Sequence, residues 1–211
     1  MKLLIACPTQ RQSRSSIGTR SKTAERCERC HALTAVCFCA CIPALDTRAR
    51  LVVVLHMQEA KRPTNTGRLA TLALTNSELH LRGVLDAPAE LAFAPDRRTV
   101  VLYPDADATV LSAQWVAADT RPITLVVPDG SWRQASKMPR RELALRDLPR
   151  VKLPPMLAPQ TALRREPKPE GMATLAAIAY AFGIIESPAV EAALLGVLHA
   201  AVAATLRARG Q

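Results

Sequence analysis

Hydrophobic residues gather in short, continuous runs along the chain, and these runs predict β-strands. They cover residues 51–55, 79–84, 99–103, 123–127 and 150–153. Most are rich in Val, Leu and Ile without polar alternation, which is typical of strands buried on both faces of a parallel sheet. Apolar residues recur at helical spacing over residues 66–74, 112–118, 132–145, 172–182 and 189–207. Strands alternating with helices predict an α/β fold, with a mostly parallel sheet flanked by helices.

Three of the predicted strands end in turn residues, and these ends mark the expected binding site. The turns are Tyr-Pro-Asp at 103–105, Val-Pro-Asp-Gly at 127–130 and Leu-Pro-Pro at 153–155. In open α/β sheets, ligands collect at the carboxyl ends of the strands. The sequence has no GxGxxG and no GxxxxGK[ST] motif, which argues against a dinucleotide-binding Rossmann site and against a P-loop.

Charge favours a polyanionic partner. Among 211 residues, 28 Lys and Arg stand against 18 Asp and Glu, giving a formal net charge of +10. Nucleic acid is the first candidate for such an excess, although an anionic membrane surface or an acidic protein attracts it too. Because the chain has only two Trp, two Tyr and three Phe, we expect phosphate contacts rather than serial base stacking to provide the binding.

The length allows one core with a small appendage. Residues 1–26 are polar and basic without a hydrophobic period, which predicts a flexible arm, either simply solvated or phosphate-binding. No continuous apolar run approaches the roughly 20 residues that span a bilayer. We therefore expect no membrane partner, and we interpret the last predicted helix as a packing helix. Without an export signal, we expect a cytoplasmic protein with reduced cysteines.

Clustered cysteines predict a structural metal site. The four thiols of a Cys-x2-Cys-x6-Cys-x-Cys pattern belong to Cys27, Cys30, Cys37 and Cys39. Four thiolates match the ligand number of a closed, tetrahedral structural zinc site, without an open position for water. Cys41 is an alternative to Cys39 as the fourth ligand, and His31 is another in principle. The competing interpretation is a group of buried free thiols.

Four segments, taken together, resemble the DTW-domain family, tRNA-uridine aminocarboxypropyltransferases related to the SPOUT superfamily. The segments are the paired cysteines, residues 55–67 (LHMQEAKRPTNTG), residues 127–135 (VPDGSWRQA), and residues 163–166 (LRRE) leading into 173–177 (ATLAA). Ser131 replaces the Thr of the family's Asp-x-Thr-Trp signature and keeps the hydroxyl. Met57 stands where Pro is usual. Ala173 and Ala176 replace a Ser and a Glu, which weakens any catalytic role at position 176.

The resemblance implies transfer of the 3-amino-3-carboxypropyl group of S-adenosylmethionine to N3 of a uridine in tRNA, releasing methylthioadenosine. Asp129 is the candidate base, or the carboxylate that positions uridine or cofactor; its alternative role is a helix N-cap. Trp132 is expected to line the adenine pocket or to stack on uracil, and its alternative is a core position. The alternative functions are a SPOUT-type RNA methyltransferase and a non-catalytic zinc-knuckle RNA-binding protein.

The resemblance also implies a SPOUT-like fold with a C-terminal knot and three regions: a flexible arm (1–26), a zinc knuckle (27–45) and a catalytic domain (46–211). The cofactor contacts that it implies are Leu102, Tyr103, Pro104, Pro128, Gly130, Ser131, Leu153, Leu163 and Thr174. The candidate tRNA phosphate contacts near these motifs are Arg62, Arg68, Arg133, Lys137, Arg140, Arg164 and Arg165. A solvated charged face is the alternative for some of them. The oligomeric state stays open.

Overall fold

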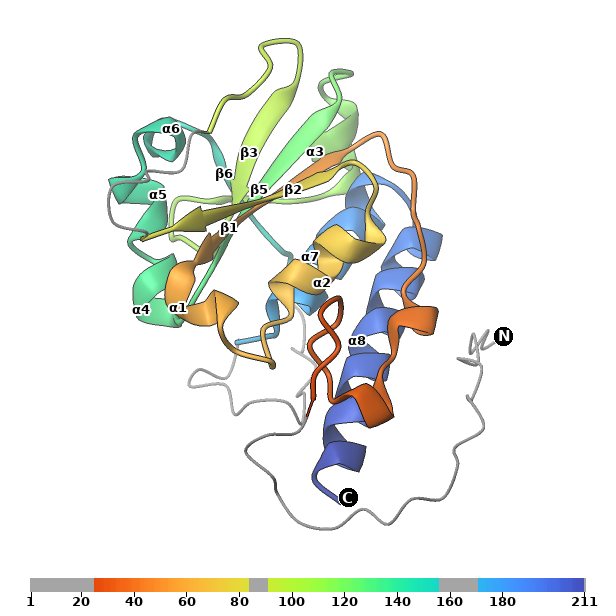
Figure 1. Ribbon diagram of the computed structural model, residues 1–211. Helices are drawn as coiled ribbons and strands as arrows, with labels where there is room; N and C mark the ends of the chain where they lie inside the picture. The colour runs from red at the N-terminus through yellow and green to blue at the C-terminus, as the bar shows by residue number, and fades with distance from the viewer. Residues whose placement is uncertain (1–24, 84–90, 156–170, 211) are drawn as a thin grey trace.

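Six parallel strands form one sheet in the part of the chain that the structure describes. The computed structural model describes residues 25–83, 91–155 and 171–210 (Figure 1). The strands are β1 (Arg50–His56), β2 (Ser77–Arg82), β3 (Arg98–Leu102), β4 (Thr109–Val110), β5 (Ile123–Asp129) and β6 (Arg150–Lys152). They lie in the order β2-β1-β5-β3-β6-β4, and every pairing is parallel. The predicted α/β fold with a parallel sheet is confirmed.

Helices cover both faces of this sheet (Figure 1). The α-helices are α1 (Met57–Ala60), α2 (Gly67–Ala73), α3 (Ala113–Ala117), α4 (Trp132–Ala135), α5 (Met138–Arg141), α6 (Leu143–Arg146), α7 (Thr174–Ile185) and α8 (Pro188–Ala208). Two single 3₁₀ turns, η1 (Thr34–Val36) and η2 (Cys39–Cys41), precede the sheet. Helices α2, α3, α7 and α8 contribute to the larger core on one face, while α5 and α6 contribute to a smaller core on the other.

Residues of β1 alternate between the two cores, which explains why the strand is apolar throughout. Leu51, Val53 and Leu55 belong to the larger core, whereas Val52 and Val54 belong to the smaller one. The neighbouring strand β5 is buried along its whole length. A strand packed on both faces has no room for the polar alternation of a half-exposed strand. Burial of β5 also carries its last residues into the interior, at the edge where its chain turns toward α4.

The cysteine-containing segment packs on the α/β body. Cys30, Phe38 and Ile42 belong to the same apolar cluster as the main sheet and helices, and η1 and η2 lie against α8. This segment therefore shares the large core instead of forming one of its own.

Helix α8 is long and apolar enough to cross a membrane by length and composition alone, with 21 residues and a mean hydropathy of 1.8. We expected no apolar segment of this length because we considered only uninterrupted apolar runs. When the length and mean hydropathy of a whole helix are used instead, that expectation is wrong. Leu194, Val197 and Leu198 bury one side of α8 in the main core, and the helix packs along α7. These contacts are those of the predicted packing helix.

Two predictions of local structure need correction, and two short elements were not predicted. The single helix expected over residues 132–145 is divided into α4, α5 and α6. Pro139 lies near the start of α5, where its missing N–H is tolerated, whereas inside a continuous helix it would remove a hydrogen bond and clash with the preceding turn. The strand expected over 79–84 ends at Arg82, because Gly83 has a left-handed φ of 84°. The two-residue strand β4 and the helix α1 were not predicted.

The expected C-terminal knot is not shown by the described residues. Residues 156–170 connect β6 toward α7 and lie outside the part of the chain that the structure describes. Most of the basic arm, residues 1–24, lies outside it as well.

Candidate active site

A pocket of about 500 Å³ opens at the carboxyl ends of β3, β5 and β6. Other parts of its wall come from the loop after α1, from α4 and from the start of α7. The three strand-end turns singled out in the sequence therefore meet around one cavity, as parallel strands require. The residues predicted for catalysis or cofactor contact that line it are Leu102, Tyr103, Pro104, Pro128, Asp129, Gly130, Ser131, Trp132, Leu153 and Thr174. Leu163 lies outside the described residues.

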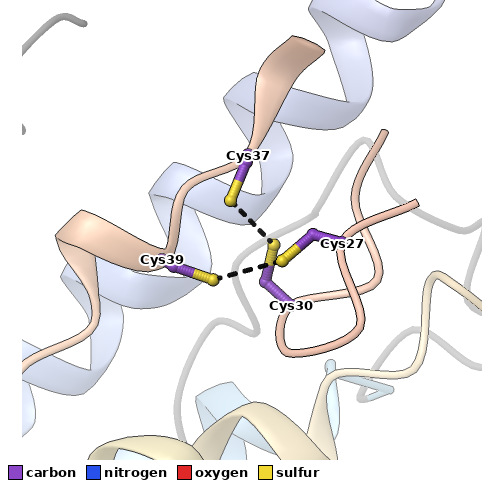
Figure 2. A group of neighbouring side chains, drawn as sticks. All are labelled: Cys27, Cys30, Cys37 and Cys39. Carbon is purple, nitrogen blue, oxygen red and sulfur yellow. Dashed lines mark hydrogen bonds between the residues drawn. The ribbon is translucent and has the colours of Figure 1, made fainter. Parts of the chain in front are cut away.

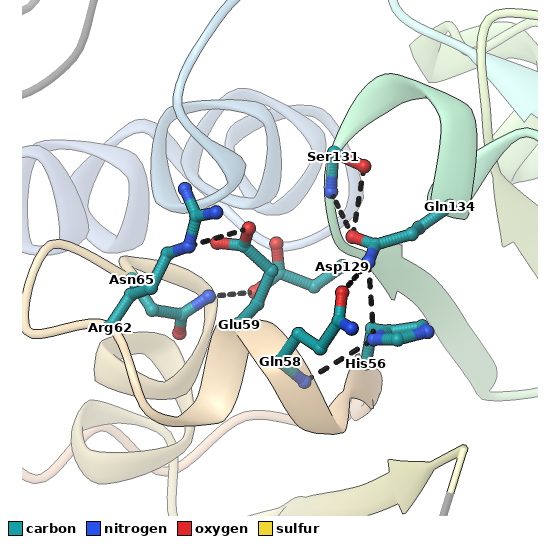
Figure 3. A network of polar contacts seen from close by, with 8 residues as sticks. All are labelled: His56, Gln58, Glu59, Arg62, Asn65, Asp129, Ser131 and Gln134. Carbon is teal, nitrogen blue, oxygen red and sulfur yellow. Dashed lines mark hydrogen bonds and ion pairs between the residues drawn. The ribbon is translucent and has the colours of Figure 1, made fainter.

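Asp129 ends β5 and is buried in the wall of this pocket, with 4% of its surface exposed. Its Oδ2 accepts a hydrogen bond of 2.7 Å from Asn65 Nδ2 (Figure 3), and its Oδ1 accepts one of 2.7 Å from Thr174 Oγ1. One bond to each oxygen fixes the orientation of the carboxylate. The carboxylate ties together three segments that are far apart in sequence.

The close approach of α2 to Asp129 requires glycine at position 67. A Cβ atom added to Gly67 would lie 2.2 Å from Asp129 Oδ2 and 3.2 Å from Thr174 Cγ2. Any side chain there would displace the carboxylate or the helix. Within three residues, Asn65 thus supplies the hydrogen-bond donor and Gly67 leaves room for the Asp129 carboxylate that accepts the bond.

Asp129 does not act as the helix N-cap that was its alternative role. Ser131 is the N-cap of α4 and forms a capping box with Gln134. The Ser131 N–H donates to Gln134 Oε1 at 2.8 Å, and Gln134 Nε2 donates in turn to Gln58 Oε1 at 2.9 Å, after the end of β1 (Figure 3). These bonds join the start of α4 to α1, and the cap of α4 is formed without Asp129.

Glu59 is a second buried acid in the pocket wall. Its side chain is 3% exposed, and its Oε1 lies 3.2 Å from the Nε of Arg62, whose side chain is 57% exposed (Figure 3). The guanidinium therefore reaches from bulk water to a buried carboxylate. The pair presents a negative and a positive group side by side, an arrangement suited to a ligand with both an ammonium and a carboxylate.

Aromatic side chains complete the wall. Trp132, the first residue of α4, is half-buried and is not part of either apolar core of the described chain. Its alternative role as a core residue is therefore not supported. Tyr103, after the end of β3, also lines the pocket, and burial raises the pKa of its hydroxyl. Tyr103 is thus a neutral hydrogen-bond donor at physiological pH.

The four predicted metal ligands converge near the surface. All four sulfur atoms lie within 4.8 Å of one another, with Cys27 Sγ 3.5 Å from Cys39 Sγ and Cys30 Sγ 3.7 Å from Cys37 Sγ (Figure 2). A tetrahedron of Zn–S bonds near 2.3 Å has edges of about 3.8 Å, so the spacing fits a zinc ion. Cys39 completes this group, and Cys41 is not a member.

The protonation of these thiols shows what metal binding must change. A hydrogen bond from the backbone N–H of Cys30 lowers the pKa of Cys27 to about 6, whereas burial, together with the neighbouring thiols, raises the pKa of Cys39 to about 12. A metal ion that binds all four sulfurs as thiolates displaces the protons of the thiols.

The predicted phosphate contacts separate into two groups. Arg133 and Arg140 are exposed and Lys137 is half-buried on α4, α5 and the connection between them. Arg68 is buried, with 9% of its surface exposed, and its Nη1 donates to the carbonyl of Arg29. The structure does not support Arg68 as a phosphate contact, because its charged end points into the protein. Arg164 and Arg165 lie outside the described residues.

Sequence reasoning gave no role to Glu59 or Asn65, although both stand in the segment that carries the resemblance. A signal was present in the chain. Both polar residues follow closely on the buried strand β1, at the same edge as Asp129, where parallel strands deliver their functional side chains. Asn65 pairs with Asp129, 64 positions away, and the burial of Glu59 depends on how distant segments pack, so a local pattern reveals neither role.

Comparison with known proteins agrees with the resemblance. A profile of the DTW domain matches residues 24–206. A tRNA-uridine aminocarboxypropyltransferase 2 from Drosophila melanogaster is 28% identical over 192 residues, which cover 82% of this chain and 72% of that protein. The protein of the same name from Mus musculus is 28% identical over 167 residues, covering 76% of this chain but only 56% of its own.

Among solved structures, the SAM-dependent rRNA:acp-transferase Tsr3 from Vulcanisaeta distributa is similar at 17% identity and a TM-score of 0.45, over 81% of this chain and 85% of that one. The DTW profile covers most of the chain and includes the pocket, the Asp129 loop and the four cysteines. The chain therefore belongs to the DTW-domain family.

Proposed function

We propose that this chain transfers the 3-amino-3-carboxypropyl group of S-adenosylmethionine to N3 of a uridine in tRNA. Relatives named tRNA-uridine aminocarboxypropyltransferase match most of the chain. The observation that carries the proposal is the rigidly held Asp129 carboxylate inside a pocket of small-molecule size. Bound S-adenosylmethionine supplies an electrophilic carbon next to a sulfonium, which is already a good leaving group. The protein must then orient the reactants, exclude water and accept one proton.

Asp129 accepts the N3–H of uracil in this proposal. Its bonds from Asn65 and Thr174 come from neutral donors, which stabilise the charged carboxylate and hold it in one orientation. The carboxylate lines the pocket and is 4% exposed, so little bulk water competes for it. A fixed acceptor orients the uracil ring and receives the proton as the new N–C bond forms.

Glu59 and Arg62 recognise the amino-acid end of the cofactor in this proposal. An ammonium group is attracted to the buried Glu59 carboxylate, and a carboxylate group is attracted to the guanidinium of Arg62. This pairing suits aminocarboxypropyl transfer, because the group that moves carries both charges. Apolar wall residues, including Leu102, Leu153 and Met172, provide the surface for the uncharged parts.

The basic surface provides the affinity for tRNA in this proposal. Arg133, Lys137 and Arg140 follow the pocket residues Ser131 and Trp132 along the chain. Their positive charges, within a formal net charge of +10, suit contacts to phosphates on either side of the modified uridine. Affinity for tRNA should therefore fall steeply as salt concentration rises.

Nucleoside mass spectrometry tests the reaction directly. Purified protein is incubated with unmodified tRNA and S-adenosylmethionine, and the tRNA is digested to nucleosides. We expect a uridine carrying the aminocarboxypropyl increment. A methyl increment would instead indicate the methyltransferase alternative, and an unmodified tRNA that still binds would indicate the non-catalytic RNA-binding alternative.

The roles of individual residues need matched variants. Asp129→Asn keeps the shape but removes the base, and should lower kcat by roughly 100-fold or more while tRNA binding is kept. Asp119→Asn is the control, because Asp119 pairs with Arg121 outside the pocket and should leave turnover unchanged. Arg62→Ala should raise the KM for S-adenosylmethionine; a rise only in the KM for tRNA would contradict our assignment of Arg62.

We also propose that the fold is SPOUT-like, with a C-terminal knot, and that residues 46–211 form the catalytic domain. Three parallel strand ends and the start of α7 meet around one pocket, and this arrangement supports the proposal. An experimental structure that traces residues 156–170 tests it: a connection that threads no loop would contradict the knot.

A further inference from the structure

Arg68 is a buried cation with an unusual environment. It follows Gly67 in the first turn of α2 and is 9% exposed. Its Nη1 donates to the carbonyl oxygen of Arg29 at 2.8 Å. In the described part of the chain, its Nε and Nη2 have no hydrogen-bond partner. Leaving two N–H groups of a buried guanidinium without acceptors is costly, so this arrangement calls for a partner of negative charge.

The cysteine cluster provides that negative charge. Arg29 lies between Cys27 and Cys30, so this side-chain bond already joins Arg68 to the turn that holds two of the ligands. Burial lowers the pKa of the Arg68 guanidinium, and negative charge on Cys30, Cys27 or Cys39 acts against that shift. The hydrogen bond to the Arg29 carbonyl places the guanidinium beside this turn.

We propose that Arg68 is the charge partner of the metal-loaded cysteine cluster, with Nε and Nη2 donating to its thiolate sulfurs. Four thiolates around one divalent ion leave a net charge of −2, which is unfavourable beside a protein core. A buried guanidinium offsets half of that charge and supplies hydrogen bonds to sulfur. Groups in this position outside the ligands usually tune the affinity for the metal.

The same residue connects the cluster to the pocket. The backbone N–H of Arg68 donates to Asn65 Oδ1 at 3.2 Å, and Asn65 Nδ2 donates to Asp129 Oδ2 at 2.7 Å (Figure 3 shows the second bond). Gly67, between them in sequence, packs against the same carboxylate. The first turn of α2 is therefore held on one side by the cluster and on the other holds Asp129. We infer that Arg68 is a positioning residue for Asp129, a step that rests on the proposed function.

Zinc affinity tests the charge partnership without reference to transferase activity. The full-length protein is titrated with a chromogenic chelator that competes for zinc. Arg68→Met keeps the length of the side chain but removes its charge, and should weaken zinc binding by roughly 10- to 100-fold. The control is Arg29→Met, which removes an exposed guanidinium that donates to the Cys39 carbonyl and should bind zinc nearly as wild type does. Equal zinc affinity in wild type and Arg68→Met would overturn the partnership.

A conservative variant guards against misfolding. Arg68→Lys keeps the charge but has no planar fork, so we expect it to fold and to recover part of the zinc affinity that Arg68→Met loses. If Arg68→Met does not fold, the comparison of Arg68→Lys with wild type decides the question, since an unchanged affinity in the lysine variant would contradict the proposed bonds to sulfur.

Hydrogen exchange tests the connection to the pocket. In the wild-type protein, removal of zinc by a chelator should increase amide exchange in residues 64–74, which contain Asn65 and α2. Residues 143–152, which contain α6 and β6, serve as the control region, where exchange should not change. Exchange in 64–74 that is unaffected by zinc removal would contradict the connection even if the zinc partnership holds.

Measurements of kcat and KM distinguish a role of Arg68 in positioning Asp129 from a role in stability alone. Folded Arg68→Met protein should show a lower kcat with an unchanged KM for S-adenosylmethionine, and Arg68→Lys should restore part of the kcat. A residue of merely structural importance would lower the melting temperature and leave the kcat of the folded fraction intact. That outcome would overturn the positioning role. Absence of turnover in the wild type would instead contradict the proposed function and leave the zinc result standing.

Discussion

A single methyl group at position 67 should disable the site, because Gly67 is in contact with the Asp129 carboxylate. The Cβ atom of Gly67→Ala would lie 2.2 Å from Asp129 Oδ2 and 2.8 Å from Asp129 Cγ. Ordinary contacts begin near 3.4 Å. The carboxylate and the helix must therefore separate by about 1 Å, since overlap at the shorter distance is strongly repulsive.

The expected magnitudes follow from that displacement. A shift of about 1 Å in a catalytic group lowers the rate by roughly 100-fold. Overpacking costs about 1–3 kcal/mol, and replacing glycine in a helix offsets at most about 1 kcal/mol of this cost. We therefore expect Gly67→Ala to lose nearly all turnover while its free energy of unfolding falls by about 0–3 kcal/mol.

Gly196→Ala is the matched control. Gly196 lies in the middle of α8, and an added Cβ would meet nothing within 4 Å. The same substitution should stabilise the protein there by about 0.5–1 kcal/mol. For a chain of this size, about 1 kcal/mol corresponds to a rise of about 2–4 °C in melting temperature. Turnover of Gly196→Ala should equal that of wild type.

Single-turnover transfer to tRNA and thermal melting, applied to both variants, check the reasoning. If Gly67→Ala melts above wild type and keeps its kcat, the carboxylate has room to move without loss. Such a result would refute the claim that a fixed Asp129 carries the reaction.

Three further predictions concern the core, the metal and the pH dependence. Leu125→Ala, at a fully buried position of β5, should lower the free energy of unfolding by about 2–5 kcal/mol in urea titrations. Zinc chelation should lower the melting temperature of wild type and of Cys41→Ser but have no further effect on Cys39→Ser, which loses a ligand; metal analysis checks the ligand directly. The hydrogen bond from His80 lowers the pKa of Glu78 below its ordinary value of 4.5, so its contribution is present above that value and is lost as the pH falls through the lowered pKa. Glu78→Gln should therefore destabilise the protein at neutral pH, by no more than about 1 kcal/mol for so exposed a pair, and have no effect near pH 2.

Much of the fold could be predicted because parallel strands carry a local signature. The apolar run at 123–127 predicted β5, and the Pro-Asp-Gly turn after it predicted the pocket, since both depend on residues adjacent in the sequence. The prediction from apolar spacing failed around Pro139. The spacing predicts one continuous helix, but proline lacks the N–H that a helix interior requires, and the helix is divided. The four cysteines were identified correctly because metal ligands in a small knuckle are close in sequence.

The residues that determine the site's chemistry depend on contacts across the chain. Asn65 and Thr174 reach Asp129 across 64 and 45 positions, and no local pattern records such a pairing. The burial of Arg68 was even harder to predict from the sequence. A charged residue in a basic sequence is expected in solvent, but packing of α2 against the cysteine turn buries its guanidinium.

The sequence by itself determined the α/β fold, the strand ends that supply the pocket, the metal ligands and the family. It did so because these features follow from periodicity, turn residues and short spacings, which are properties of neighbouring positions. Only the tertiary structure decided that Asp129 is a tethered carboxylate rather than a helix cap, that Glu59 is buried beside Arg62, and that Arg68 is buried with its guanidinium bonded to the Arg29 carbonyl. Burial and pairing depend on which surfaces the folded chain brings together, and distant segments determine those surfaces jointly.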